Sequence, residues 1–506
     1  MASMIDSSCH ASVSVRLLSG EVLFGPEQLA PGTNAGDLKR LLSNHQFFAE
    51  GGSDALETRC LVHADRELQD EEVLDTFVAE DAVVLTLLRL QPTYRVVVWG
   101  DSKRGGKMPR NVAAQLQSGV SEIFSSDSAF AALKKSGEVV AWGDARYGGC
   151  AESVIDQLQS GVVSISSNAY AFAALKENGC VVTWGDSRHG GDSSQVARQL
   201  ENGVTTVHGS ARAFAAICEA GRVVVWGSAS YAGFGDVPSD LCDVIAISSN
   251  DGAFAALTGS SAVIAWGDPE CGGDTTAVAE QLCHGIKSVH ANGHAFAATT
   301  DGGAVIAWGR LDRGGDTGHA RPSLECDVVS ICSSDSAFAA VRADGSVVSW
   351  GKAENGGDPG DRASQLQEDV VEVCSHSSGL AFAALKKNGS VVTWGIDAVG
   401  GDSSSVAADL ADDVRFVFSN SLAFAAVKGS GAVVTWGMPS GGGDSSEVAE
   451  QVSRGITRLR SSAMAFAALS NSGGVVTWGA PRFGGELPVE LVPEVSDSVV
   501  EIHGNG

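Results

Sequence analysis

A short valine-rich run that ends in Trp-Gly returns ten times along the chain and accounts for every tryptophan in it. Successive tryptophans are 40 to 44 residues apart, and six of the nine intervals are 42 residues. A repeat of this period is typical of a solenoid, a propeller or a similar array of small units. The ten residues are Trp99, Trp142, Trp184, Trp226, Trp266, Trp308, Trp350, Trp394, Trp436 and Trp478.

Each repeat unit carries the pattern of three short strands. An apolar strand such as 120–123 is followed by Ala-Phe-Ala-Ala, a glycine turn and the strand that ends in Trp-Gly. A glycine turn between two strands of matched length predicts a hairpin. The alanines beside each phenylalanine predict strands that approach one another closely, as inner propeller strands must. After Trp-Gly, apolar residues four apart, such as Val196 and Leu200, predict one helical turn.

The first ninety residues have a different organisation. Residues 1–11 are predicted to form a flexible tail. Alternating apolar residues predict strands at 13–17, 22–24, 58–62 and 83–90, and Thr33 is placed to cap a helix between the second and third strands. The expected order in residues 12–91 is therefore ββαββ.

Four segments carry a family resemblance in this region: VRLLSGEVLF, GDLKRLL, RCLVHADRELQDEEVL and LTLLRL. In this order they resemble a ubiquitin-like domain, which implies a small β-grasp fold. By position, the resemblance implies an exposed apolar patch for protein partners made by Leu18, Val62 and Leu87 or Leu88. The alternative is that these residues only fill the local core. Where ubiquitin ends in Gly-Gly, this chain continues with Gln91-Pro92, so we expect a built-in module that is not conjugated to other proteins.

The repeats carry a second resemblance, over residues 93–506. The segment SGVVSISSNAYAFAALKENGCVVTWGD and its eight counterparts resemble the repeats of the regulator of chromosome condensation family. In their short unit they are also similar to bacterial β-lactamase-inhibiting propellers with three-stranded blades. The resemblance implies a mostly β chain whose large domain is a β-propeller of about nine three-stranded blades. Because 95–99 supplies only a third-type strand and 499–502 only a first-type strand, an open superhelical stack of the same blades is the alternative.

Composition limits the classes of partner. The formal net charge of −27 disfavours duplex nucleic acid, because phosphate binding needs a clustered cationic face. No run of eighteen apolar residues appears, so no membrane insertion is expected. The eleven cysteines are scattered and odd in number, which favours buried reduced thiols in a protein of the cytoplasm or the nucleus. We expect a monomer.

The sequence offers little that points to catalysis. A recurring aspartate follows Gly-Gly in most units, and an aspartate before a helical turn is suited to capping its free N–H groups. Capping is favoured over metal binding because the pattern repeats in nearly every unit. The histidines are dispersed, and no nucleophile or metal-ligand motif appears. We therefore expect no enzyme activity, no metal and no cofactor. The aspartates are Asp192, Asp274, Asp316, Asp358, Asp402 and Asp444.

Residues that vary inside the constant frame predict a binding rim. One set precedes Ala-Phe and the other follows Trp-Gly, and such variation on a repeat scaffold is typical of a binding surface. Tyrosine and arginine are favoured interface anchors. The alternative is unconstrained surface drift. The first set is Tyr170, Arg212, His294, Leu380, Leu422 and Met464, and the second is Arg104, Tyr147, Arg188, Arg313 and Phe483.

These observations favour a non-enzymatic protein-interaction scaffold. We expect an adaptor that holds a client on the propeller rim and reaches ubiquitin or protein-quality-control machinery through the ubiquitin-like domain. Two alternatives follow from the repeat resemblance. One is a guanine-nucleotide exchange factor for a small GTPase, which the uniform unit length and the acidic balance disfavour. The other is a propeller-type enzyme inhibitor.

Overall fold

A computed structural model gives the fold of residues 95–229, 237–238, 241–376 and 378–504, and the backbone of five strands before residue 91. The chain divides into two compact units, Met1–Tyr94 and Arg95–Gly506, each described here by itself.

The first unit contains one five-stranded sheet. Its strands lie in the order β2-β1-β5-β3-β4, with β1 and β5 parallel and the other neighbours antiparallel. Val62 pairs with Thr86, directly before Leu87 and Leu88 in β5. The predicted tail, the predicted helix, Leu18 and the side chains of the other patch residues lie outside the described residues. The strands are β1 (Ser12–Leu17), β2 (Val22–Gln28), β3 (Thr58–His63), β4 (Arg66–Glu67) and β5 (Ala82–Leu90).

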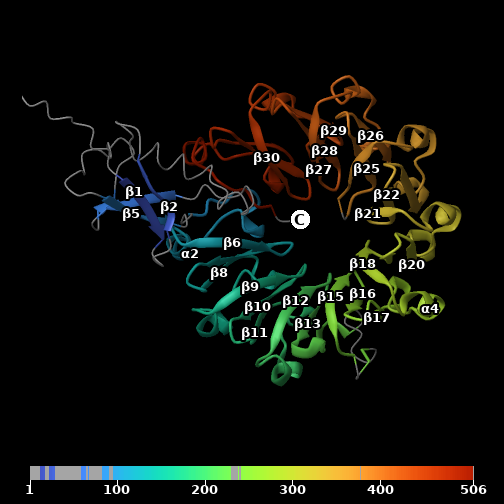
Figure 1. Cartoon of the computed structure of the whole chain (residues 1–506), viewed down its shortest axis with the longest axis horizontal. Helices are drawn as coiled ribbons and strands as arrows, with labels where there is room; N and C mark the ends of the chain where they lie inside the picture. Colours follow the sequence, from blue (N-terminus) through green and yellow to red (C-terminus); the bar gives the residue numbers. More distant parts are fainter. Residues whose placement is uncertain are drawn as a thin grey trace, which may run out of the picture. The chain divides into compact units, whose positions relative to one another are not determined.

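The second unit is built from three-stranded antiparallel sheets, and its described residues contain nine of them, as the repeat predicts. Figure 1 shows the sheets following one another around a ring, with the first strand of each sheet nearest the centre. Their strands are β6 (Val120–Ser125), β7 (Ala129–Lys134), β8 (Val139–Gly143), β9 (Val162–Ser167), β10 (Ala171–Lys176), β11 (Val181–Gly185), β12 (Val204–Gly209), β13 (Ala213–Cys218), β14 (Val223–Gly227), β15 (Val244–Ser249), β16 (Ala253–Thr258), β17 (Val263–Gly267), β18 (Ile286–Ala291), β19 (Ala295–Thr300), β20 (Val305–Gly309), β21 (Val328–Ser333), β22 (Ala337–Arg342), β23 (Val347–Gly351), β24 (Val370–Cys374), β25 (Ala381–Lys386), β26 (Val391–Gly395), β27 (Val414–Ser419), β28 (Ala423–Lys428), β29 (Val433–Gly437), β30 (Ile456–Ser461), β31 (Ala465–Ser470) and β32 (Val475–Gly479).

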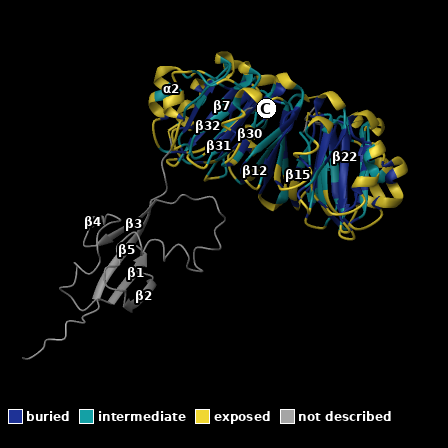
Figure 2. Cartoon of the chain, turned by 90° about the horizontal axis from the view of Figure 1, so that it is seen from above, coloured by how far each residue is buried: buried dark blue, intermediate teal, exposed yellow. Residues whose placement is uncertain are grey.

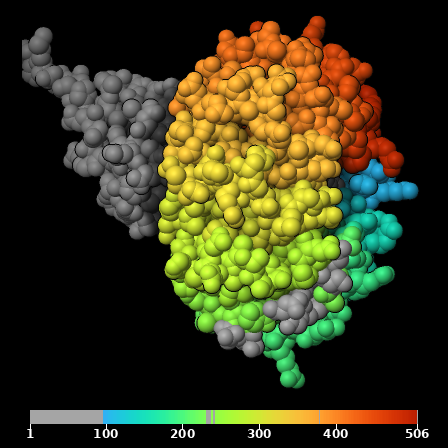
Figure 3. Space-filling view, turned by 90° about the vertical axis from the view of Figure 1, so that its right-hand side faces the viewer, coloured from blue at the N-terminus to red at the C-terminus, as the bar shows by residue number. Residues whose placement is uncertain are grey.

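Figure 3 shows the outer edge of the ring, with successive units as bands of colour. The helical turns of the second unit are short, and most are 3-10 helices (η). All of them lie outside the sheets except η8 (Glu219–Gly221), which lies in the hairpin between β13 and β14. They are η3 (Ser102–Arg104), α2 (Arg110–Gln115), η4 (Ala145–Tyr147), η5 (Glu152–Gln157), η6 (Ser187–His189), η7 (Ser194–Gln199), η8 (Glu219–Gly221), η9 (Pro269–Cys271), η10 (Thr276–Val278), α4 (Ala279–Leu282), η11 (Leu311–Arg313), η12 (Gly318–Leu324), η13 (Ala353–Asn355), η14 (Gly360–Leu366), η15 (Asp397–Val399), η16 (Ser404–Val406), η17 (Pro439–Gly441), η18 (Ser446–Val448), η19 (Pro481–Phe483) and η20 (Val492–Glu494).

The Ala-Phe strand is the middle strand of each sheet, not the inner one that the alanines suggested. In the second sheet, β10 pairs with β9 and β11, and Phe172 lies opposite Trp184 with ring centroids 5.2 Å apart. The alanines are small because the middle strands of neighbouring sheets pack directly on one another. Figure 2 shows this buried layer running through the thickness of the ring.

The Gly-Gly pair that follows nine of the ten Trp-Gly positions lets neighbouring units pack closely. Gly148 has φ +93°, and a Cβ there would lie 2.5 Å from the ring of Phe172 in the next sheet. A Cβ on Gly149 would lie 2.3 Å from the backbone carbon of Gly143. Trp184 Nε1 then donates to the Gly148 carbonyl oxygen at 2.9 Å. The repeated glycines are therefore required by close packing.

The two ends of the array are in contact. Trp99 Nε1 donates to the Gly484 carbonyl oxygen at 2.9 Å, which repeats the bond between Trp184 and Gly148. The Asp101 N–H donates to the Arg482 carbonyl oxygen at 3.1 Å, and the two side chains pair at 3.1 Å. The units therefore form a closed ring and not an open stack.

Candidate protein-interaction surface

Two sets of loops are clamped together on one side of seven of the nine described sheets. Asn168 Nδ2 donates to the His189 carbonyl oxygen at 2.7 Å, while Asn168 Oδ1 accepts the N–H groups of Tyr170 and Ala171. The loop before the Ala-Phe strand is thus fixed to the turn after Trp-Gly. We call the surface made by these paired loops the loop face. The same clamp joins Ser126 to Tyr147, Asn250 to Cys271, Asn292 to Arg313, Ser334 to Asn355, Asn420 to Gly441 and Ser462 to Phe483.

An aromatic cluster occupies the first part of the loop face. Tyr170 stacks on Tyr147 at 5.3 Å and on His189 at 4.3 Å between ring centroids. The Arg212 guanidinium lies 6.0 Å from the centre of the Tyr170 ring. The structure thus brings three residues of the predicted rim together from three units. Sequence reasoning missed His189: it occupies the position equivalent to Tyr147, whereas the predicted Arg188 is an exposed neighbour.

A charged cluster follows it around the ring. Arg313 pairs with Asp335 at 3.3 Å and donates to Ser336 at 3.1 Å. A Cβ on Gly293 would lie within 3.4 Å of carboxylate oxygens of both Asp251 and Asp335, so the two acids approach this glycine together. Desolvation by the neighbouring loops raises the pKa of Asp251 although its side chain remains exposed, and the charge of His294 opposes the rise. Asp251 and Asp335 were not predicted, because each lies one residue before the variable position that precedes Ala-Phe.

The remaining part of the loop face is aliphatic. Leu380 and Leu422 are half-buried and pack beside Ile396 and Met438, which belong to the turns after Trp-Gly. Met464 holds the same position in the last sheet and is also half-buried. The predicted rim residues therefore divide into an aromatic, a charged and an aliphatic part.

A smaller pair of predicted residues lies where the array closes. The Arg104 guanidinium is 5.5 Å from the centre of the Phe483 ring. The pKa of the nearby Asp127 is raised by desolvation, which the charge of Arg104 opposes. These two rim positions, 379 residues apart in sequence numbering, meet only through closure of the ring.

The recurring aspartate side chains accept hydrogen bonds from the backbone N–H groups two residues later in the chain. The Asp444 carboxylate accepts the Ser446 N–H at 2.9 Å, and this bond lowers the pKa of Asp444. Asp192, Asp274, Asp316, Asp358 and Asp402 accept the corresponding N–H groups. Within the described residues, no three His, Cys, Asp or Glu side chains lie close enough together to hold a metal ion.

The cysteines differ from the prediction in their exposure. All nine in the described ranges are free, but Cys150, Cys242, Cys283 and Cys326 are exposed and not buried. Burial raises the pKa of Cys332 to about 12 and that of Cys374 to about 11, so neither thiol is a ready nucleophile at neutral pH. In the described part of the chain, no helix is both long and apolar enough to cross a membrane.

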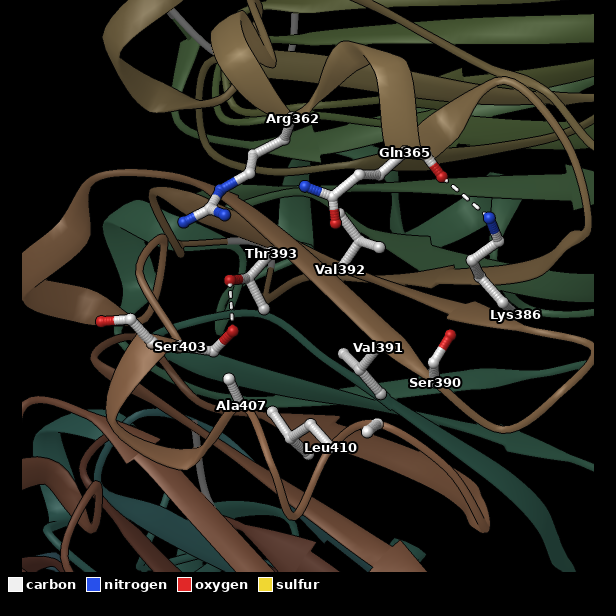
Figure 4. A pocket seen from close by; sticks show the side chains of 12 residues that line it. Arg362, Gln365, Lys386, Ser390, Val391, Val392, Thr393, Ser403, Ala407 and Leu410 are labelled. Carbon is white, nitrogen blue, oxygen red and sulfur yellow. Dashed lines mark hydrogen bonds between the residues drawn. The ribbon is translucent and has the colours of Figure 1, made fainter.

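A cavity of about 410 Å³ lies between η14, β26 and η16 (Figure 4). Lys386 Nζ donates to the Gln365 carbonyl oxygen at 2.9 Å, and Thr393 Oγ1 donates to Ser403 Oγ at 3.0 Å. Lys176 and Thr183 make the same bonds in the second sheet. The bonds that line this cavity therefore recur in the repeat. These polar groups are already hydrogen-bonded to other groups of the protein.

No protein-family model matches the sequence, and no curated protein matches it significantly. Similar solved structures include Prp20p from Saccharomyces cerevisiae, described with its binding to Gsp1p and histones, at 16% identity over 52% of this chain and 83% of that one, with a TM-score of 0.31. The CRINKLY WD40 ectodomain of the receptor kinase ACR4 from Arabidopsis thaliana is 17% identical over 54% and 93%, with a TM-score of 0.30. Human WBSCR16 is 16% identical over 66% and 79%, with a TM-score of 0.28. No function can be transferred from proteins at this level of similarity.

Proposed function

We propose that the chain is a non-enzymatic protein-interaction scaffold whose loop face holds a protein client. The observation that carries the proposal is the Tyr147–Tyr170–His189–Arg212 cluster, in which rigid aromatic rings and a guanidinium from three units share one surface. Aromatic side chains supply large contact area at low entropic cost, and aromatic and arginine side chains are the usual centres of protein interfaces. The adjoining aliphatic part supplies apolar area of the kind that an interface core buries.

The first unit would connect this scaffold to ubiquitin or protein-quality-control machinery. The parallel pairing of β1 with β5 requires a crossover connection, which suits the ββαββ order of a ubiquitin-like domain. The apolar patch of Leu18, Val62 and Leu87 or Leu88 would be its docking surface. The repeats would belong with those of the chromosome-condensation regulators, and the protein would act as a monomer in the cytoplasm or the nucleus.

The test is quantitative affinity capture with three full-length variants. Tyr170→Ala combined with Arg212→Glu removes the aromatic anchor and reverses one charge, so a client of the loop face should be depleted about tenfold or more. Val62→Glu should deplete ubiquitin-pathway proteins and keep the client. Val489→Ser, at an 85% exposed position that does not belong to the loop face, is the control.

If all variants capture the same proteins in the same amounts, the adaptor function is wrong. Capture of one small GTPase by the loop face, followed by accelerated nucleotide release in a stopped-flow assay, would favour the exchange-factor alternative. Capture of one hydrolase with loss of its activity would favour the inhibitor alternative.

A further inference from the structure

The closed ring has ten tryptophan positions but only nine complete sheets in the described residues. At the tenth position, residues 95–99 take the place of a third strand and residues 499–504 that of a first strand. Val96 and Val499 keep the backbone bonds of their equivalents, to the carbonyl oxygens of Leu116 and Gly473. Neither segment is paired as a strand in the described structure. We call the place between them the tenth slot.

The side chains around the slot are less buried than their equivalents in the other sheets, although Ala467 still packs in a buried cluster with Leu469 and Ile502. Trp99 is half-buried, whereas the nine other tryptophans are 0–4% exposed. Phe130, at the start of the next sheet, is half-buried, whereas the eight other phenylalanines of this position are 0–2% exposed. Ala467, in the last middle strand, is 9% exposed, and its eight equivalents are 0–1% exposed. All three differences point to one missing neighbour.

The missing neighbour is a middle strand with a phenylalanine. Each of the nine other tryptophans stacks on a phenylalanine of its own sheet at 5.2–5.6 Å, and Trp99 has no such partner among the described residues. A Cβ on Gly484 would meet only Trp99, at 3.3 Å, whereas at Gly148 it would meet a phenylalanine ring at 2.5 Å.

Backbone hydrogen bonds also indicate that the described residues lack a middle strand at this position. The Asp144 N–H donates to the carbonyl oxygen of Ser128, which lies directly before the middle strand of its own sheet. All eight later units repeat this bond. The Asp101 N–H instead reaches Arg482 in the preceding turn, because the slot offers it no equivalent of Ser128.

We propose that the tenth slot binds an extended segment of a partner protein, in which a phenylalanine is flanked by alanine or glycine and followed by an aliphatic residue. The slot continues the interface of middle strands that joins the other sheets, so the occupant must resemble Ala-Phe-Ala-Ala. It would add as the central strand, with main-chain bonds on both sides and its ring on Trp99. A second copy of this chain is a poor donor, since all nine of its strands of this kind already lie in its own sheets.

The first test asks whether the slot is open in solution. Ala467→Arg places a long charged side chain in the slot, and the full-length variant should keep a melting temperature close to that of the wild type. The matched control is Ala425→Arg, at the equivalent position of the preceding sheet, where the alanine is fully buried. It should unfold the protein or lower its melting temperature strongly. Equal destabilisation by both substitutions would overturn the proposal.

The second test measures binding of a defined probe by fluorescence anisotropy. The probe is a labelled peptide with the sequence of residues 169–177, which contains a middle strand of this protein. It should bind the full-length wild type, and the affinity should fall about tenfold or more with Ala467→Arg or with glutamate in place of the peptide phenylalanine. Absence of binding to the wild type, or equal binding of both peptides, would overturn the proposal.

Light scattering during size-exclusion chromatography identifies the source of the occupant. The wild type and Ala467→Arg should both be monomers. A wild-type dimer that Ala467→Arg separates would mean that a second copy fills the slot, and the partner-protein proposal would then be wrong. Neither test depends on the loop face, because Ala467 lies in the interface between middle strands.

Discussion

His208 and His290 lie in the first strands of their sheets, and His376 lies two residues after another first strand. Burial lowers the pKa of all three imidazoles, because it disfavours their charged form. The unfolded chain, with a histidine pKa near 6.5, then binds more protons than the folded chain in mildly acidic solution. The histidines therefore stabilise the fold above about pH 6.5, and this contribution is lost as the pH falls through their folded-state pKa.

Replacing His290 should make the protein less sensitive to acid. His290→Gln keeps a hydrogen-bonding side chain beside Ser288 but cannot be protonated. Its melting temperature should fall less than that of the wild type between pH 7 and pH 5, when followed by differential scanning fluorimetry. His319→Gln, at an exposed position of η12, is the control and should follow the wild type. If the melting temperatures of all three proteins fall in parallel, His290 takes up no proton on unfolding, and burial does not lower its pKa.

At the scale of the repeated element, glycine spacing decides whether neighbouring units can approach. The second glycine of each Gly-Gly pair lies against the backbone of its own Trp-Gly, with only 2.3–2.5 Å available for a Cβ. The contacted atoms belong to the backbone, so the strain cannot be relieved by a side-chain rotation. This close approach is the physical reason why Gly-Gly recurs in the repeat.

Gly149→Ala should destabilise the protein by about 2–3 kcal/mol, since the backbone at Gly143 must move. Gly302→Ala is a matched control, because the new Cβ would meet nothing closer than Thr300 Oγ1 at 3.9 Å. The control should be neutral or stabilising by about 0.5 kcal/mol through loss of unfolded-state entropy. Chemical denaturation followed by tryptophan fluorescence measures both changes, and equal effects would contradict the close-approach argument.

At the scale of the whole molecule, the ring closes although its described residues form no complete tenth sheet. The contacts that hold its ends are those of Trp99 and Asp101 with Gly484 and Arg482, supported by an ion pair of Arg95 with Glu494 at 3.3 Å. The bonds of Trp99 and Asp101 join residues 385 and 381 positions apart. Closure also creates the Arg104–Phe483 pair and both sides of the tenth slot.

Closure can be tested by crosslinking its ends. In a protein with Asp101→Cys and Arg482→Cys, a disulfide should form, because the Asp101 nitrogen lies 3.1 Å from the Arg482 carbonyl oxygen. The product should migrate faster on a non-reducing gel, and mass spectrometry should identify the linked peptides. Lys352→Cys with Arg482→Cys is the control, since Lys352 is equivalent to Asp101 in another unit. An open array would crosslink neither pair.

The sequence by itself determined the local pattern: the period, the three strands of each unit, their hairpins and the helical turns. These depend on residues within about forty positions of one another, where spacing and turn chemistry are sufficient. It also predicted a binding rim, which stays a prediction. Among its residues it named Arg188 where His189 stacks on Tyr170, and it passed over Asp251 and Asp335. Those side chains meet across different units, so no single unit shows the cluster.

Only the tertiary structure decided that the ring closes and that its described residues lack one middle strand. Whether an array closes depends on the rotation between neighbouring units added over the whole circle, and no segment of sequence carries that sum. The ends suggested that a strand was absent, but the sequence could not show whether they met. The exposure of Trp99, Phe130 and Ala467 answered the question, because burial is a property of neighbours brought together by the complete fold.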